Sequence, residues 1–214
     1  MSDEPAWLDR IAHDLRGPLM PLQTAAYLLR NGGLDAERQA ELVDVIDRQT
    51  RQLARMIDEL GDWLRASQHR LIGHRESCDL ASLLDAAAVG AGVQAPPVDD
   101  RSGDAQVDGD PQRLVQLLRI LLSFANALCH GATPAVILVR ADRRLRMDWE
   151  MAGAAGAENV DDLFTRPQHD PFDGGLGLQL LLARAIAQAH GGQLEAMAAG
   201  EVLRLRCELP LAEG

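Results

Sequence analysis

The stretch IAHDLRGPLMPL, residues 11–22, decides how the first part of the chain folds. Apolar residues recur at helical spacing within it and on both sides of it, so the pattern predicts a helix. Pro18 lies inside that helix, where its ring removes a backbone hydrogen bond, and it therefore predicts a bend. His13 lies two positions beyond Ile11, about 200° around the helix axis. We therefore expect its imidazole to face solvent.

The residues after this stretch predict a second, longer helix. Asn31-Gly32-Gly33 indicates the end of the first helix, and Asp35 can cap the next one. The second helix carries a heptad seam with one glutamine in it: Leu42, Ile46, Gln49, Leu53, Met56, Leu60 and Trp63. Two helices with one apolar stripe each bury little surface alone, so we expect a homodimer, a four-helix bundle formed through residues 5–66. The alternative is a two-helix arm that packs on its own chain.

The remainder of the chain mixes strand and helix patterns. It predicts a strand and a short helix over 75–92, a helix over 110–130, strands over 135–140 and 144–151, a glycine-led helix over 175–192, and closing strands over 193–197 and 202–211. Residues 95–109 and 152–162 are interpreted as turn and loop. We predict an α+β fold with a helical hairpin in residues 1–70. Residues 75–214 should form an α/β sandwich, a mostly antiparallel sheet with helices on one face.

Charge and composition exclude several classes of function. The 214-residue chain has a formal net charge of −11, which argues against binding to nucleic acid or to an anionic membrane surface. No apolar run approaches the roughly 20 residues that cross a bilayer, so we expect no membrane insertion. The start, MSDEPAWLDR, lacks the basic and apolar regions of a signal peptide. Three cysteines without metal-ligand spacing indicate reduced thiols in a cytoplasmic protein.

The neighbours of His13 favour phosphoryl chemistry. Asp14 follows it directly, and a carboxylate beside an imidazole can accept a proton and raise the nucleophilicity of a ring nitrogen. Arg16 supplies a cation that can hold phosphate oxygens. A histidine that is simply solvated on a polar helix face is the alternative interpretation.

Four segments together carry a family resemblance. HDLRGPL (13–19) resembles the phosphoacceptor box of two-component sensor histidine kinases, while GLGL (175–178), AHGG (189–192) and ELPL (208–211) resemble the end of their ATPase-like catalytic domain. The resemblance implies that His13 accepts a phosphoryl group, with Asp14 as general base, and passes it to a receiver aspartate of a response regulator. It also implies that ATP and Mg²⁺ are cofactors.

The predicted magnesium site departs from the family pattern. DPQRLVQLLRILLSFANA, which begins at Asp110, resembles the family's asparagine box, but its two asparagine positions fall on Ile120 and Phe124. Neither side chain can coordinate a hard cation. Asn126 fills one of the positions only in an alignment shifted by two residues. We therefore predict no metal ligand with the unshifted alignment, and Asn126 as a nucleotide-site residue with the shifted one.

The remaining nucleotide-site residues follow from the same resemblance. Glu150 or Ala152 falls at the place of the family's adenine-binding aspartate, depending on a one-residue gap, and Gly153 and Gly156 belong to the turn after it. Gly175 and Gly177 precede a helix, where glycine backbone N–H groups can cradle phosphates. A flexible loop of small residues is the alternative at 152–156.

Three functions fit these observations. The first is a kinase that phosphorylates its own His13 from ATP, using a nucleotide site that lacks some of the family's residues. The second is a histidine phosphotransferase that binds no ATP and exchanges phosphoryl groups between receivers. The third is a non-catalytic pseudokinase that binds a kinase or a response regulator.

Overall fold

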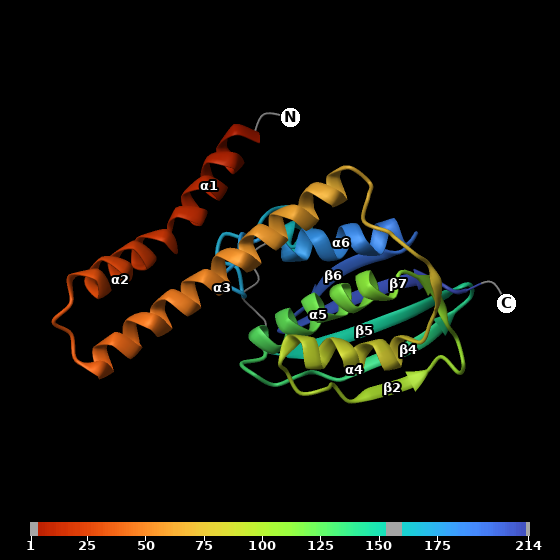
Figure 1. Cartoon of the computed structure of the whole chain (residues 1–214). Helices are drawn as coiled ribbons and strands as arrows, with labels where there is room; N and C mark the ends of the chain where they lie inside the picture. The colour runs from red at the N-terminus through yellow and green to blue at the C-terminus, as the bar shows by residue number, and fades with distance from the viewer. Residues whose placement is uncertain (1–3, 153–159, 213–214) are drawn as a thin grey trace. The chain divides into compact units, whose positions relative to one another are not determined.

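The computed structural model describes residues 4–152 and 160–212 and consists of two compact units (Figure 1). The first unit comprises Met1–Gly61 together with Gly174–Leu176, and the second comprises Asp62–Asp173 and Gly177–Gly214. The first unit is helical, and the second holds the sheets. The predicted α+β class is confirmed.

The first unit contains α1 (Glu4–Arg16), α2 (Leu19–Asn31) and the larger part of α3 (Ala36–Ser67). The predicted bend at Pro18 is a full interruption, because Gly17 and Pro18 form a turn between two separate helices. The Gly17 N–H donates to the Asp14 carbonyl at 3.2 Å, which closes the end of α1. His13 and Asp14 therefore lie in the last turn of a helix rather than in its middle.

A short loop joins α2 to α3, and the two helices run antiparallel (Figure 1). Gly32 caps α2 with φ +68°, a left-handed value that favours glycine. Asp35 caps α3 as predicted, since its Oδ1 accepts from the Arg38 N–H at 2.8 Å. Ala25 and Met56 are buried in this unit, and Met56 belongs to the predicted seam.

The second unit is built on a five-stranded sheet in the order β2-β4-β5-β7-β6. Its strands are β2 (Val98–Arg101), β4 (Val136–Ala141), β5 (Arg144–Ala152), β7 (Val202–Pro210) and β6 (Gln193–Ala199). β2 pairs with β4 in parallel, and the other neighbours are antiparallel. β1 (Glu76–Cys78) and β3 (Val107–Gly109) form a separate antiparallel pair.

Helices cover one face of this sheet (Figure 1). They are α4 (Leu80–Ala91), α5 (Pro111–Leu128) and α6 (Gln179–Ala189), with a 3₁₀ turn, η1, at Val160–Asp162. The core follows from alternation along the strands: in β7, Leu203, Leu205 and Cys207 are buried while the intervening arginines are not. Those arginines pair with acidic residues of β5, which leaves the opposite face of the sheet charged.

Two sequence predictions are corrected by the structure. Residues 95–109 were expected to be turn and loop, but they contain β2 and β3. All four residues of β2 are exposed, so this edge strand shows no apolar alternation that would reveal it. The helix expected over 175–192 begins only at Gln179, because Gly177 has a left-handed φ of +77° that cannot continue a helix.

The structure also bears on insertion into a membrane. Among the residues it describes, none of the helices combines the length and the apolar character that crossing a bilayer requires.

Candidate functional site

His13 lies in the last turn of α1 with 85% of its side chain exposed, as its place opposite Ile11 predicts. Its Nδ1 is 3.3 Å from Asp14 Oδ1. On the other side of that carboxylate, Arg10 Nε lies 3.8 Å from Asp14 Oδ2. The structure therefore brings the predicted nucleophile and the predicted base together.

This contact favours one ring nitrogen for chemistry. A carboxylate at Nδ1 favours the tautomer that carries its proton there, and Nε2 then keeps its lone pair for attack. Arg16 is also exposed, three residues further along α1, where a side chain shares roughly the same helix face. The end of α1 thus presents an imidazole, a carboxylate and a guanidinium group close together.

The two positions of α5 where the family resemblance calls for asparagine lie in the core. Ile120 is 3% exposed and Phe124 is 6% exposed. The Phe124 ring makes an edge-to-face contact with Phe172, with ring centroids 5.5 Å apart. Apolar packing therefore fills this place.

Asn126, which only the shifted alignment assigns to the nucleotide site, makes side-chain hydrogen bonds to the turn after α5. Its Nδ2 donates to the Gly131 carbonyl at 2.9 Å, and Thr133 Oγ1 is 3.4 Å away. These bonds tie the turn after α5 to the last part of the helix. The amide oxygen and nitrogen are thus oriented by the turn that follows the helix.

The other matching residues of the same motif position α5. Asp110 caps the helix by accepting from the N–H groups of Gln112 and Arg113, and its Oδ2 accepts from the Gly73 N–H at 2.8 Å. Gln116 Nε2 donates to Asp62 at 2.5 Å, and Arg113 Nη1 donates to the same carboxylate at 2.9 Å. This part of the motif therefore joins α5 to the last turns of α3 within the second unit.

Glu150, predicted near the adenine position, lies on β5 and is ion-paired with Arg204 of β7. Gly153 and Gly156 lie outside the described residues. Of Glu150, Gly153 and Gly156, only Glu150 lies in the described part of the chain, and it forms a cross-strand ion pair on the sheet.

The glycine segment before α6 is held by backbone contacts. A Cβ on Gly177 would lie 2.4 Å from the Gln168 carbonyl oxygen, so this position admits only glycine. The Gln168 N–H donates to the Gly177 carbonyl at 2.9 Å. In the first unit, which contains Gly175, the Leu176 N–H donates to the buried Glu59 carboxylate at 2.8 Å. One N–H that could meet an anion is thus bound to a carboxylate.

His190 is buried and has a structural role. Its Nε2 accepts from the Asp110 N–H at 3.0 Å, and Nδ1 lies 2.8 Å from the Ile186 carbonyl, to which it can donate. Burial lowers the pKa of His190 below its ordinary value, so the ring is neutral in the folded chain.

Two buried carboxylates were missed by sequence reasoning. Glu59 and Asp62 lie three residues apart on α3 and are 2% and 9% exposed. Each stands next to an apolar seam position, Leu60 or Trp63, in a helix that carries many other acids. Their partners are distant in sequence, so only the fold identifies them. Within residues 4–152 and 160–212, no group of three His, Cys, Asp or Glu side chains could hold a metal ion.

Sequence comparisons identify relatives for the helical part and for nearly the whole chain. Residues 6–68 match the family model described as His Kinase A (phospho-acceptor) domain. The Sensor protein ChvG of Rhizobium meliloti is 27% identical over 209 residues, which cover 87% of this chain and 36% of the relative. The Bacteriophytochrome of Pseudomonas aeruginosa is 29% identical over 216 residues, covering 95% of this chain and 29% of the relative. The chain spans about a third of the length of these relatives.

Solved structures share the fold. Histidine kinase AdeS of Acinetobacter baumannii superposes with a TM-score of 0.72 at 20% identity, covering 94% of this chain and 98% of that one. Histidine kinase ThkA in complex with response regulator protein TrrA gives a TM-score of 0.73 at 19% identity, covering 99% of this chain and 63% of that one. Family model and fold together support a sensor histidine kinase core, a phospho-acceptor hairpin with an ATPase-like domain.

Proposed function

We propose that this chain, a sensor histidine kinase core of two-component signal transduction, carries a phosphoryl group on His13 and exchanges it with a response-regulator receiver aspartate. The observation that carries the proposal is the His13 side chain, 85% exposed with a carboxylate at Nδ1. An imidazole held in this way presents Nε2 to an incoming phosphorus atom without rearrangement of the helix.

The exchange uses groups at the end of α1. Nε2 of His13 attacks the phosphorus of a phosphoaspartate, the P–N bond forms, and the P–O bond to the aspartyl carboxylate breaks. The ring becomes cationic as it attacks, and Asp14 stabilises that charge and can take the Nδ1 proton. Arg16 is placed to neutralise phosphate oxygens. The reverse sequence returns the phosphoryl group to a receiver.

We also propose that the chain forms a homodimer through residues 5–66, an arrangement that would suit this function. Several large hydrophobic residues of the first unit are exposed, among them Met20, Tyr27 and Ile57 at 70%, 64% and 60%. A second copy would cover them in a four-helix bundle. Solved histidine kinase structures share the fold, and one of them, ThkA, is described in complex with a response regulator.

In the unshifted alignment, the residues on α5 do not suit a magnesium–nucleotide site. The positions that would supply oxygen ligands are then Ile120 and Phe124, and both are packed in the core. Phe172 lies against Phe124, so this position makes apolar contacts. Mg²⁺ needs oxygen ligands in near-octahedral geometry. We therefore derive no step of the exchange through ATP.

Autophosphorylation from ATP is the second candidate function. It is supported by the relatives named as sensor proteins and by the likeness to full-length ShkA, solved in complex with AMPPNP (TM-score 0.64, 20% identity, 98% of this chain and 46% of that one). The glycines at 174, 175 and 177 also favour it. The core position of Phe124 opposes it.

Two predictions remain proposals at this point. We propose that residues 1–70 act as the dimerisation and phosphotransfer hairpin and that residues 75–214 act as the ATPase-like domain. We also propose that the chain works in the cytoplasm, where its partner receivers would be found.

A labelling experiment separates the two candidate functions. The chain is incubated with Mg²⁺ and γ-labelled ATP in one arm, and with receiver domains charged with a labelled phosphoryl group in the other. His13→Ala is the control in both arms, checked for fold and oligomeric state. Acid-labile label in the receiver arm alone supports exchange without ATP, and label in the ATP arm supports autophosphorylation. Absence of label in both arms contradicts phosphoryl transfer through His13.

A further inference from the structure

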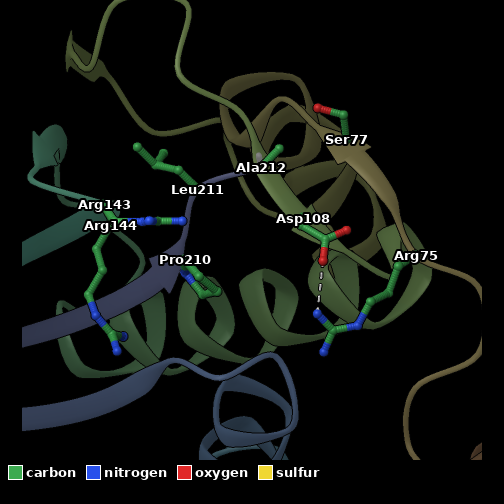
Figure 2. A pocket seen from close by; sticks show the side chains of 8 residues that line it. All are labelled: Arg75, Ser77, Asp108, Arg143, Arg144, Pro210, Leu211 and Ala212. Carbon is green, nitrogen blue, oxygen red and sulfur yellow. Dashed lines mark hydrogen bonds and ion pairs between the residues drawn. The ribbon is translucent and has the colours of Figure 1, made fainter. Parts of the chain in front are cut away.

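The second unit contains a hollow that none of the predicted site residues lines. It has a volume of about 700 Å³ and lies where β1, β3, the turn between β4 and β5, and the end of β7 meet (Figure 2). Figure 2 shows Arg75 and Asp108 on one side and Arg143 and Arg144 across from them. This volume falls in the range of small-molecule sites, about 300–1,000 Å³.

The charge of the lining opposes the charge of the chain. Among the described residues that line it, three are arginines and one, Asp108, is acidic, so this part of the lining carries a net positive charge. The whole chain has a formal net charge of −11. A concave surface of one sign concentrates ligands of the opposite sign. The composition of this hollow therefore points to an anion.

Two of the arginines are held in place by the structure. Arg75 Nη1 lies 3.0 Å from Asp108 Oδ2, and its Nη2 donates to the Ala189 carbonyl at 2.9 Å. Arg144 Nη1 donates to the Gly191 carbonyl at 3.2 Å. Each guanidinium has five N–H donors in a fixed plane, so these bonds orient the groups and use only part of their donors. Binding an anion would then cost little additional side-chain ordering.

Closure of the C-terminal end of α6 explains part of this arrangement. Arginine side chains commonly bind the last carbonyl groups of a helix, as Arg75 does at Ala189, whereas Arg144 binds the Gly191 carbonyl two residues beyond α6. Arg143 lies in the exposed turn before β5. The Arg143 carbonyl accepts from the Leu211 N–H at 2.9 Å, which fixes its backbone at the rim of the hollow. The Ser77 hydroxyl lies at the opposite rim, where it donates to Gln106 Oε1 (Figure 2).

We propose that this hollow binds a small organic anion that carries at least two phosphate groups. Guanidinium groups from two sides match phosphate oxygens, which accept paired N–H bonds. None of the described residues that line the hollow is aromatic, so the proposed recognition includes no stacked nucleobase. Arg75, Arg143 and Arg144 are the binding residues. This binding is independent of His13 and of the phosphoryl exchange.

Calorimetric titration tests the proposal with fructose 1,6-bisphosphate as the probe, with glucose 6-phosphate and citrate as comparisons. Arg143→Gln and Arg144→Gln are the variants, each expected to weaken binding of the bisphosphate about 10-fold. Arg140→Gln is the matched control, because Arg140 lies exposed on the same β-hairpin but outside the lining. Thermal unfolding of each variant shows whether it is folded.

The expected result is a heat of binding for the bisphosphate that weakens with added salt and is unchanged in Arg140→Gln. Three results would overturn the proposal. One is the absence of binding to the wild-type chain at low salt. Another is equal binding by the wild-type chain and a folded Arg143→Gln/Arg144→Gln double variant. Citrate or the monophosphate binding as tightly as the bisphosphate would also contradict it, since the ligand class would then be wrong.

Discussion

Replacement of Asp62 by alanine should destabilise the second unit. The carboxylate accepts hydrogen bonds from Arg65 at 2.7 Å, Gln116 at 2.5 Å and Arg113 at 2.9 Å. Burial raises the pKa of Asp62, but the hydrogen bonds from these three side chains outweigh it and hold the pKa below its ordinary value. The folded chain therefore contains an ionised acid in a polar network at the junction of α3 and α5.

The size of this loss in stability depends on the interactions that the partners of Asp62 keep after the substitution. Removal of one partner from a buried ion pair costs about 3–5 kcal/mol. Arg113 is 20% exposed and keeps its bond to the Leu71 carbonyl, which places the cost at the lower end. Arg65 is 51% exposed and contributes little. Alanine is the better helix former and offsets about 0.5 kcal/mol. We expect a net loss of about 2.5 kcal/mol in the free energy of unfolding.

Urea unfolding measures this loss. With a slope of about 2 kcal/mol per molar urea, the midpoint should fall by roughly 1 M. Trp149, buried in the second unit, is a fluorescent reporter of the transition. Asp99→Ala is the matched control, because Asp99 pairs with Arg101 in the same unit but at the surface. If Asp62→Ala shifts the midpoint no further than Asp99→Ala does, the buried network does not stabilise this unit.

Three further predictions concern the core of the second unit. Phe124→Ala should lower the free energy of unfolding by about 3–5 kcal/mol, measured with urea, because it empties a packed site against Phe172; a loss below about 1 kcal/mol would contradict that packing. Burial lowers the pKa of His190 below 6.5, so the unfolded chain binds a proton that the folded chain excludes, and the melting temperature should fall as the pH drops through 6.5. A His190→Gln variant with an equally steep pH dependence would assign the effect elsewhere. Burial raises the pKa of the Cys207 thiol to about 12, so a thiol reagent should modify it only after unfolding; its prompt reaction in the native chain, located by peptide mapping, would contradict the burial.

Sequence patterns predicted the elements whose side chains alternate between two environments. The apolar stripe of α5 and the paired strands β4 and β5 follow from periodicity, because one face of each is buried. β2 escaped prediction, since an edge strand with four exposed residues carries no such pattern. The start of α6 was placed too early because the close contact between Gly177 and Gln168 depends on a loop brought there by the fold.

The candidate site likewise contains residues that the sequence could predict and residues that only the fold reveals. The exposure of His13 and its contact with Asp14 follow from helix geometry and adjacency, so the sequence was sufficient. Glu59 and Asp62 look like solvated acids in α3, and their bonds reach partners 117 and 51 residues away. The sequence indicated only that Phe124 cannot be a metal ligand, and it did not indicate that this side chain lies in the core. Its contact with Phe172 required the fold, because Phe172 lies in a segment without regular periodicity.

Transfer of a phosphoryl group to His13 tests the central claim most directly. The wild-type chain and His13→Ala are each mixed with receiver domains charged with a labelled phosphoryl group, taken from every response regulator of the organism that encodes the chain. Acid-labile label is then located by peptide mass spectrometry. We predict label on His13 of the wild-type chain and none on the variant. A folded wild-type chain that no receiver labels, or equal label on the two proteins, would contradict the claim that His13 carries the phosphoryl group.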